Sequence, residues 1–256
     1  MKTYETWKSL AFAVVFCVPG LPAAIAAQEA HPPHWAYEGK EGPADWGKLD
    51  STYATCSLGH TQSPIDIKDA KSADLPALKF DYQAVPLNII DNGHTIQINY
   101  PAGSTLAVGD KTYTLKQFHF HHPSEEHING HGFDLVSHLV HADADGHLAV
   151  VAILFKPGAE NPLLATLWKS IPSEKEKAVD VPGVMIDVST LLPDDHGYYT
   201  FTGSLTTPPC SEDVTWYVLK SQSSISSAEV AAFAKLYPKD ARPIQPLNGR
   251  QVLETK

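Results

Sequence analysis

The sequence predicts a mainly β fold: a single domain built on a large, mostly antiparallel twisted sheet, with a few short helices at its periphery. Two observations lead to this prediction. Short runs of β-branched and aromatic residues recur along the chain, and turn signals such as Asp-Asn-Gly at 91–93 and Pro-Ala-Gly at 101–103 separate them. Residues 27–256 contain no Gly/Ser linker, charge block or internal repeat that would divide them, and large all-β domains reach this length.

The predicted strands form ten runs with alternating or continuous apolar residues. The run at 147–156 is apolar on both of its alternating faces, which is typical of a strand in the middle of a sheet. The expected strands are 64–68, 77–80, 86–91, 94–100, 104–108, 112–121, 132–141, 147–156, 184–188 and 214–220.

Two segments carry the signals of helices. Asn161 and Pro162 have the residue types of an N-cap and a first helical position, and apolar residues follow them at helical spacing. The expected buried stripe consists of Leu163, Leu164, Leu167, Trp168 and Ile171. The second helix begins with a capping box of Ser226 and Glu229, and it is expected to run toward the end signal at Pro238.

The N-terminal segment 1–26 has the composition of a secretory signal peptide. Lys2 and Lys8 precede a short apolar run at 10–18, and small residues at 24–26 offer a cleavage site. The run is too short for a membrane anchor, and proline and glycine residues interrupt it at its end. We therefore expect removal of 1–26, no stable membrane anchor, and export, with the periplasm favoured over full secretion.

The next segment, 28–63, has few apolar alternations and many proline, glycine and histidine residues. We therefore expect it to form an irregular N-terminal arm. Its aromatic residues, among them Trp35, Tyr37 and Trp46, would lie over the body of the protein.

The charge and the cysteines restrict the partners and the compartment. The net charge is −10, and removal of 1–26 takes away two lysines and one glutamate and leaves −11. Such an acidic balance argues against nucleic acid and anionic membranes as partners. Two of the three cysteines remain, Cys56 and Cys210, and in an oxidising compartment they most simply form one disulfide. The sequence leaves the oligomeric state open, a homodimer included.

Three histidines are placed so that they can converge on one point. His119 and His121 alternate along an expected strand, so their side chains share one face, about 6.6 Å apart. His138 closes a triangle with them if 132–141 is the neighbouring antiparallel strand. A lone histidine on an apolar strand is usually structural, but eight of the thirteen histidines lie between His119 and His147. Three imidazoles with a fourth position left to water have the form of a catalytic zinc site.

These residues and others resemble the α-class carbonic anhydrases of the exported bacterial type, over essentially all of 31–256. The blocks that carry the resemblance are Gln-Ser-Pro-Ile-Asp at 62–66, Asn-Gly-His at 92–94, Gln-Phe-His-Phe-His at 117–121, Ser-Glu-Glu-His at 124–127, His-Leu-Val-His at 138–141 and Gly-Ser-Leu-Thr-Thr-Pro-Pro at 203–209. They occur in the order of the family. Residues 27–256 are accordingly expected to form a carbonic anhydrase domain.

The resemblance implies that His119, His121 and His138 are the ligands of a Zn²⁺ ion. Zinc lowers the pKa of its bound water to roughly 7, so that hydroxide exists at neutral pH. In the family this zinc-bound hydroxide attacks CO2 and gives bicarbonate and a proton, in a reversible reaction. The expected enzyme is therefore a carbonic anhydrase, a zinc lyase whose partner is a small molecule.

The resemblance also assigns residues to the nucleophile and to the substrate. The Thr206 hydroxyl is expected to accept the hydrogen of the hydroxide and to donate its own hydrogen to Glu126. Because CO2 is apolar, a small apolar wall beside the metal is expected to hold it. The residues matching this substrate site are Val140, Val150, Leu205, Thr207 and Trp216.

A proton leaves the metal in each turnover, and His94 matches the histidine that carries it to buffer in the family. Tyr37 and Asn92 match positions that order the water of this relay, with Gln97 nearby.

Hydrogen-bond partners outside the metal ligands orient the imidazole rings. Gln117 shares the strand face of His119 and matches the partner of that ring. The chain departs from the family two residues before His138, where Val136 replaces the common glutamate. The partner of the His138 ring is therefore left open.

Two other classes of protein fit parts of the pattern. The spacing of His119, His121 and Glu125, followed later by His138, also fits the metal motif of cupin-type oxygenases, although the Pro-x-Gly of their second motif is missing. The second alternative is a carbonic-anhydrase-like binding module that is catalytically weak or without turnover. The identity of the bound metal would distinguish a cupin-type oxygenase from a carbonic anhydrase. A CO2 hydration assay would distinguish a binding module from an active enzyme.

Overall fold

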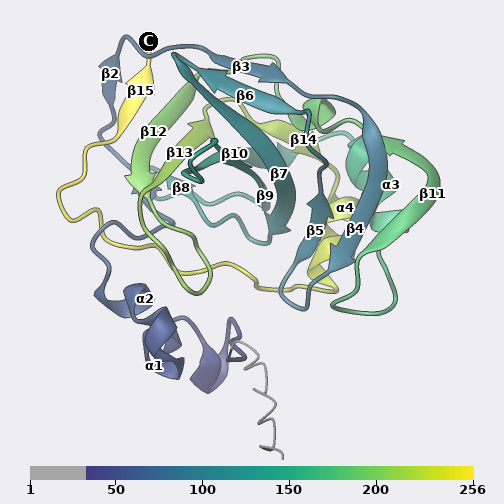
Figure 1. Cartoon of the computed structure of the whole chain (residues 1–256), viewed down its shortest axis with the longest axis horizontal. Helices are drawn as coiled ribbons and strands as arrows, with labels where there is room; N and C mark the ends of the chain where they lie inside the picture. The colour runs from purple at the N-terminus through teal and green to yellow at the C-terminus, as the bar shows by residue number, and fades with distance from the viewer. Residues whose placement is uncertain (1–32) are drawn as a thin grey trace, which may run out of the picture. The chain divides into compact units, whose positions relative to one another are not determined.

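A sheet of thirteen strands runs through the protein (Figure 1). The structure is a computed structural model that describes residues 33–256, so the signal segment expected at 1–26 lies outside the described residues. The strands are β2 (Lys71–Ala73), β3 (Leu78–Asp81), β4 (Val85–Asp91), β5 (Ile96–Asn99), β6 (Thr105–Val108), β7 (Lys111–His121), β9 (Leu135–Ala142), β10 (Leu148–Pro157), β11 (Val179–Ile186), β12 (Tyr198–Gly203), β13 (Val214–Leu219), β14 (Ser223–Ile225) and β15 (Leu253–Thr255). Ten of them follow the order β11-β4-β5-β7-β9-β10-β13-β12-β15-β2, and β14, β3 and β6 pair at its side.

The predicted fold class is confirmed. Most strand pairs are antiparallel, and the parallel pairs in this sheet are β10 with β13, β10 with β14 and β15 with β2. Strand β10 lies in the middle of the order, as its two apolar faces indicated. A separate small pair joins β1 (Asp66–Ile67) to β8 (His127–Ile128).

Several strands were not predicted. Strands β2, β14 and β15 have three residues each, which is too short for an alternation to be recognised. Strand β12 does not alternate regularly between buried and exposed positions, and β11 begins at Val179, ahead of the expected 184. These strands are defined by their pairing partners, which the local sequence does not contain.

The two faces of the sheet around β7 and β9 differ in what they bury. One side, called the core face, carries Phe118, Phe120 and Leu139 and belongs to the larger apolar cluster of the protein. The opposite side, called the cleft face, carries Val136 and Val150 of a smaller apolar cluster, together with the histidines expected to bind metal. Because strand side chains alternate, neighbouring residues of one strand serve the two faces in turn.

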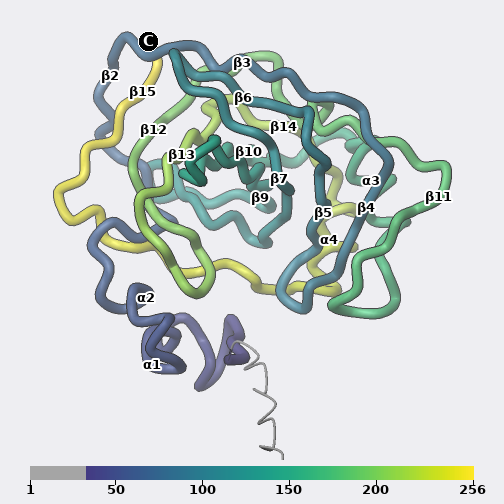
Figure 2. Tube along the Cα trace, viewed as in Figure 1, coloured from purple at the N-terminus to yellow at the C-terminus, as the bar shows by residue number. Residues whose placement is uncertain are grey.

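The two predicted helices are present as α3 (Pro162–Lys169) and α4 (Ser227–Ala234), and they pack against each other. The Asn161 side chain caps α3, and Ser226 and Glu229 form both hydrogen bonds of the capping box. Helix α4 ends at Ala234, before the expected stop at Pro238. Figure 2 shows the chain after α4 running along one end of the strands toward β15.

The N-terminal arm is less irregular than expected. It contains two four-residue helices, α1 (Trp46–Leu49) and α2 (Thr55–Leu58), and 3-10 turns at Gly39–Glu41 and Ser51–Tyr53; a further 3-10 turn lies at Val188–Leu191. The predicted disulfide between Cys56 and Cys210 joins α2 to the loop after β12. Among residues 33–256, no helix is both long and apolar enough to cross a membrane.

Candidate metal centre and active site

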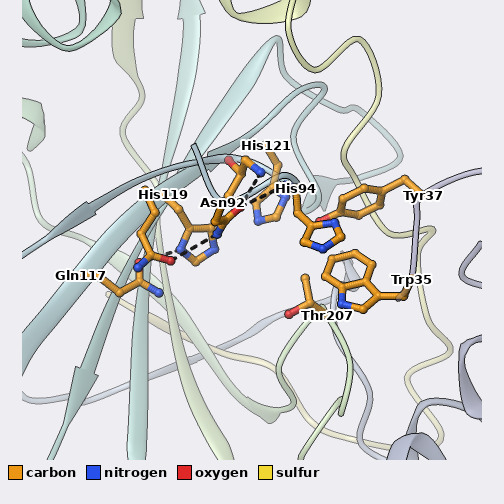
Figure 3. A pocket seen from close by; sticks show the side chains of 10 residues that line it. Trp35, Tyr37, Asn92, His94, Gln117, His119, His121 and Thr207 are labelled. Atoms are coloured by element: carbon orange, nitrogen blue, oxygen red, sulfur yellow. Dashed lines mark hydrogen bonds between the residues drawn. The ribbon is translucent and has the colours of Figure 1, made fainter. Parts of the chain in front are cut away.

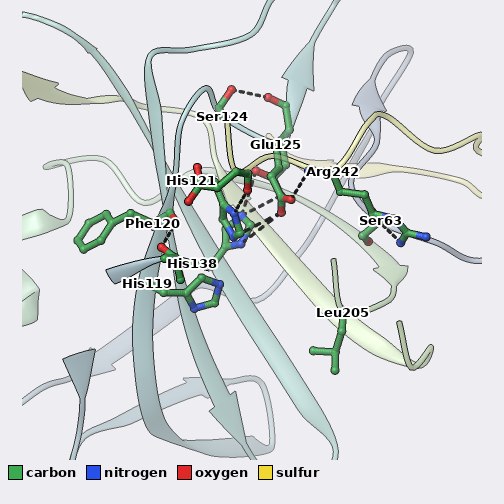
Figure 4. Close-up of polar contacts among 12 residues, drawn as sticks. Ser63, His119, Phe120, His121, Ser124, Glu125, His138, Leu205 and Arg242 are labelled. Carbon is green, nitrogen blue, oxygen red and sulfur yellow. Dashed lines mark hydrogen bonds and ion pairs between the residues drawn. The ribbon is translucent and has the colours of Figure 1, made fainter. Parts of the chain in front are cut away.

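Three histidine rings meet on the cleft face, from two neighbouring strands (Figure 4). His119 and His121 lie two residues apart on β7, and His138 lies directly opposite His119 on β9. The ring centroids are 5.1, 5.5 and 4.9 Å apart, and one nitrogen of each ring lies within 4.8 Å of the other two. The structure therefore brings the three predicted ligands together.

On β7, each ring has one nitrogen held by the surrounding chain. Nδ1 of His119 lies 2.8 Å from Oε1 of Gln117, as the resemblance implied. Nδ1 of His121 lies 2.7 Å from the backbone oxygen of Asp240, which belongs to the segment after α4. In a neutral imidazole the N–H donates, so these contacts leave Nε2 of both rings as an acceptor.

The remaining ring nitrogens fit a zinc ion. Nε2 of His121 is buried and has no hydrogen-bond partner among the described residues, and an unpaired buried polar atom is costly. Burial lowers the pKa of His119 to about 3 and lowers that of His121, which keeps both rings neutral and able to coordinate. Three imidazole nitrogens with room for a fourth ligand are the donor set of a catalytic zinc site.

The two consecutive acids, Glu125 and Glu126, contact different groups. Glu126 was expected to accept the hydrogen of the Thr206 hydroxyl, but both of its oxygens contact Nε2 of His138, at 3.0 and 3.1 Å. Oε1 of Glu125 accepts the backbone N–H of Arg242 at 2.8 Å, and its buried Oε2 has no hydrogen-bond partner among the described residues. Burial raises the pKa of Glu125 to about 7, although the neighbouring His138 and Thr206 side chains act to lower it.

The His138 ring differs electrostatically from the other two. Burial lowers its pKa, but the Glu126 carboxylate more than offsets burial, so the pKa of His138 is raised overall. The side chains of His138 and Glu126 are both almost completely buried, which strengthens their interaction because little water screens it.

An apolar cavity of about 200 Å³ opens beside the histidines. It has the chemical character expected of a site for an apolar gas, since apolar atoms form most of its wall. All five residues predicted for the substrate site line it, namely Val140, Val150, Leu205, Thr207 and Trp216. Trp216 is fixed by a hydrogen bond from Nε1 to the Ser204 backbone oxygen at 3.1 Å.

A second, more polar cavity of about 120 Å³ is lined by His119 and His121 (Figure 3). The residues predicted for proton transfer line it together: Tyr37, Asn92, His94 and Gln97. Asn92 Oδ1 accepts the backbone N–H of His94 at 3.0 Å, which holds the turn.

The His94 ring is itself held in place at the rim of this cavity. It stacks on Trp35 with ring centroids 3.7 Å apart and planes at 7°. Burial lowers the pKa of His94. The Tyr37 hydroxyl is buried and has no hydrogen-bond partner in the described part of the chain.

Sequence reasoning missed four residues that build this region: Trp35, Glu125, Asp240 and Arg242. Trp35 was expected only to cover the body of the protein, and Glu125 was weighed only as a cupin-type ligand. Asp240 and Arg242 follow helix α4, far along the chain from every recognised block, and no local pattern pointed to them. The sequence shows that two acids are consecutive at 125 and 126, but it does not show which group each of them contacts.

Comparisons with known proteins agree with this geometry. Residues 41–256 match the family model of eukaryotic-type carbonic anhydrases. A carbonic anhydrase of Pectobacterium carotovorum is 44% identical over 234 residues, which cover 91% of this chain and 96% of that protein.

Two solved structures are similar in fold as well as in sequence. The structure of a hyperthermostable carbonic anhydrase from an active hydrothermal vent chimney has a TM-score of 0.84 at 42% identity and covers 87% of this chain and 100% of that one. The α-carbonic anhydrase of Thermovibrio ammonificans, solved with the inhibitor sulfanilamide, has a TM-score of 0.83 at 40% identity, with 88% and 100% covered.

The chain therefore belongs to the eukaryotic-type, or α, carbonic anhydrase family. It is an enzyme of the carbonic anhydrase class, and its family and structural neighbours support CO2 hydration as its reaction. This family membership contradicts the alternative of a cupin-type oxygenase.

Proposed function

We propose that the protein binds one zinc ion on His119, His121 and His138 and catalyses the reversible hydration of CO2 to bicarbonate and a proton. The observation that carries the proposal is the set of three converging rings, each with one nitrogen hydrogen-bonded and the other left free. When bound, zinc supplies a nucleophile at neutral pH by lowering the pKa of a coordinated water to about 7.

Thr206 orients the nucleophile in this proposal. The buried Oε2 of Glu125 has no hydrogen-bond partner among the described residues, so it can accept the single hydrogen of the Thr206 hydroxyl, whose oxygen then accepts a hydrogen from the attacking oxygen. The backbone N–H of Arg242 fixes the Glu125 carboxylate that receives the Thr206 hydrogen. Glu125 thus takes the role that the sequence assigned to Glu126.

The apolar cavity holds the substrate. Val140, Val150, Leu205 and Trp216 offer CO2 contact without competing hydrogen bonds, and Thr207 lies between this cavity and the polar one. A small apolar pocket excludes water from the space beside the reacting carbon, so the substrate does not compete with ordered solvent there.

The polar cavity carries the proton away. His94 lines this cavity, and its imidazole can take a proton at a ring nitrogen and pass it to buffer, although burial lowers its pKa. Tyr37, Asn92 and Gln97 provide polar atoms along the way to His119 and His121, where a short chain of waters would bridge the gap.

A stopped-flow CO2 hydration assay with a pH indicator tests the proposal, together with a zinc determination on the same sample. We expect about one zinc per chain, loss of activity after exhaustive chelation, and recovery when zinc is added. Zinc-loaded protein that hydrates CO2 no faster than buffer would instead indicate the binding module without turnover.

We propose further that the chain is exported to the periplasm after removal of 1–26, with 27–256 as the mature enzyme. The disulfide between Cys56 and Cys210 supports an oxidising compartment. N-terminal sequencing of protein recovered from the periplasm of a Gram-negative host checks both points. Gel filtration of the same material distinguishes a monomer from a homodimer.

A further inference from the structure

Both oxygens of the Glu126 carboxylate contact the same atom, Nε2 of His138. The Glu126 side chain is 0% exposed, and its two oxygens lie 3.0 and 3.1 Å from Nε2 of His138. A carboxylate accepts hydrogen bonds only, so Nε2 must carry the hydrogen. The lone pair of His138 is then on Nδ1, the nitrogen that remains for a metal.

The strand that carries His138 cannot supply such a partner itself. Val136 lies two residues before His138 on β9, so both side chains are on the same face. Val136 is completely buried in an apolar cluster and lies opposite His121. Its side chain has no atom that can accept a hydrogen bond. The acceptor for the His138 ring therefore comes from the segment between β7 and β8, where Glu126 lies directly before His127.

Glu125, the neighbouring acid, is occupied elsewhere. Its Oε1 accepts the backbone N–H of Arg242, and its Oε2 is 3.8 Å from Nδ1 of His138 and 3.6 Å from Nε2 of His121. Both of these distances are too long for hydrogen bonds. The two consecutive acids thus face different groups.

We infer that Glu126 is a positioning residue for the third metal ligand, and that it supplies from a loop the carboxylate that Val136 cannot supply from the strand. The inference rests on the proposed zinc site. A carboxylate behind a metal-bound imidazole fixes the tautomer and the ring orientation, and it makes the ring a better donor to the metal. Glu126 also lies in a second buried group with Glu125 and His138 that could hold an ion directly. The short double contact to Nε2 favours the positioning role.

The test is the rate at which zinc-loaded protein loses its metal to excess dipicolinate at fixed pH. Removal of such a partner weakens metal binding about 10- to 100-fold, so Glu126→Ala should release zinc up to about 100-fold faster than wild type. Glu126→Gln keeps an oxygen acceptor without the charge, and we expect release about 10-fold faster. The isosteric Gln variant carries the test if the Ala variant does not fold.

A relocation variant sharpens the test. In Glu126→Ala combined with Val136→Glu, the carboxylate returns on the strand face of His138, and we expect zinc release to slow again toward the wild-type rate. The visible spectrum of the cobalt-substituted proteins should follow the same order, because it reports the geometry of the ligands and not the activity.

Glu229→Ala is the matched control. Glu229 is also a buried carboxylate, but it caps α4 and the segment at Asn161, so its loss should lower the melting temperature and leave zinc release unchanged.

Three results would overturn the inference. One is wild-type zinc release from Glu126→Gln, and another is equal acceleration by Glu229→Ala. The third is two zinc ions per wild-type chain, which would make Glu126 a ligand. Wild-type protein without zinc or CO2 hydration would refute the proposed function itself, which separates the two failures.

Discussion

The core face and the cleft face of the sheet bury side chains equally well but for different reasons. Phe120 and His121 are consecutive residues of β7, both 0% exposed, and they point to opposite faces. Phe120 packs against the rings of Trp168 and Phe233, with centroids 5.0 and 6.1 Å away, and these contacts depend on area and shape. His121 depends on the direction of its ring, since one ring nitrogen contacts the Asp240 backbone oxygen and the other, buried, has no hydrogen-bond partner among the described residues.

This difference indicates that the core face contributes mainly to stability and the cleft face mainly to function. A change on the core face removes contact area, so its cost rises gradually with the volume lost. A change on the cleft face removes a partner from a directional group, so chemistry fails while most of the fold is kept. Four predictions follow this division, in decreasing order of expected effect.

His121→Ala should reduce the zinc content from about one ion per chain to nearly none, because only two imidazole ligands remain. CO2 hydration should be lost with it. Metal analysis after gel filtration measures the first effect, and circular dichroism shows that the sheet is retained. Unchanged zinc in this variant would remove His121 from the ligand set.

Phe120→Ala, one residue away, should behave in the opposite manner. The free energy of unfolding should fall by about 4 kcal/mol, because a large buried ring is replaced by a cavity. Zinc content per folded chain should stay at the wild-type value. Urea unfolding and metal analysis check the two parts. If this variant lost zinc as completely as His121→Ala, the two faces would not be separable.

His141→Gln sharpens the comparison from the core face, where a single imidazole is buried beside the Tyr82 hydroxyl, 2.8 Å away. Burial lowers the pKa of His141 to about 4, so between pH 6.5 and pH 4 the unfolded chain binds a proton that the folded protein does not. The free energy of unfolding therefore falls as the pH falls, by about 3 kcal/mol over this range from His141 alone.

The Gln variant does not titrate, so that part of the pH dependence should disappear. Urea unfolding of both proteins at pH 7 and pH 4 measures the difference between their slopes, in which contributions from the metal site cancel. Equal slopes would show that His141 is not held neutral by the core.

His94→Ala tests the outer end of the cleft face, and its effect should be the smallest. In dilute buffer the maximal hydration rate should fall about 100-fold, equivalent to about 2.7 kcal/mol, because proton transfer loses its carrier. Added imidazole should restore part of the rate, and CO2–bicarbonate exchange should change little. His147→Ala, at an exposed histidine in another turn, is the control. A wild-type rate for His94→Ala in dilute buffer would leave His94 without this role.

Much of the architecture could be predicted from local sequence. The two-residue period of strands placed His119 and His121 on one face, and the apolar run at 148–155 identified the central strand. The capping box at Ser226 and Glu229 located a helix start. Each of these signals lies within one segment, because the backbone geometry that produces it repeats every two or every 3.6 residues.

Only the tertiary structure decided which group each of the two consecutive acids contacts. Glu125 and Glu126 lie in a loop between β7 and β8, where no repeating backbone geometry relates a residue's position to the direction of its side chain. Their partners come from elsewhere: Arg242 from the segment after α4, and His138 from the neighbouring strand. The division of roles depends on packing among segments far apart in the chain, and that packing exists only once the sheet has formed.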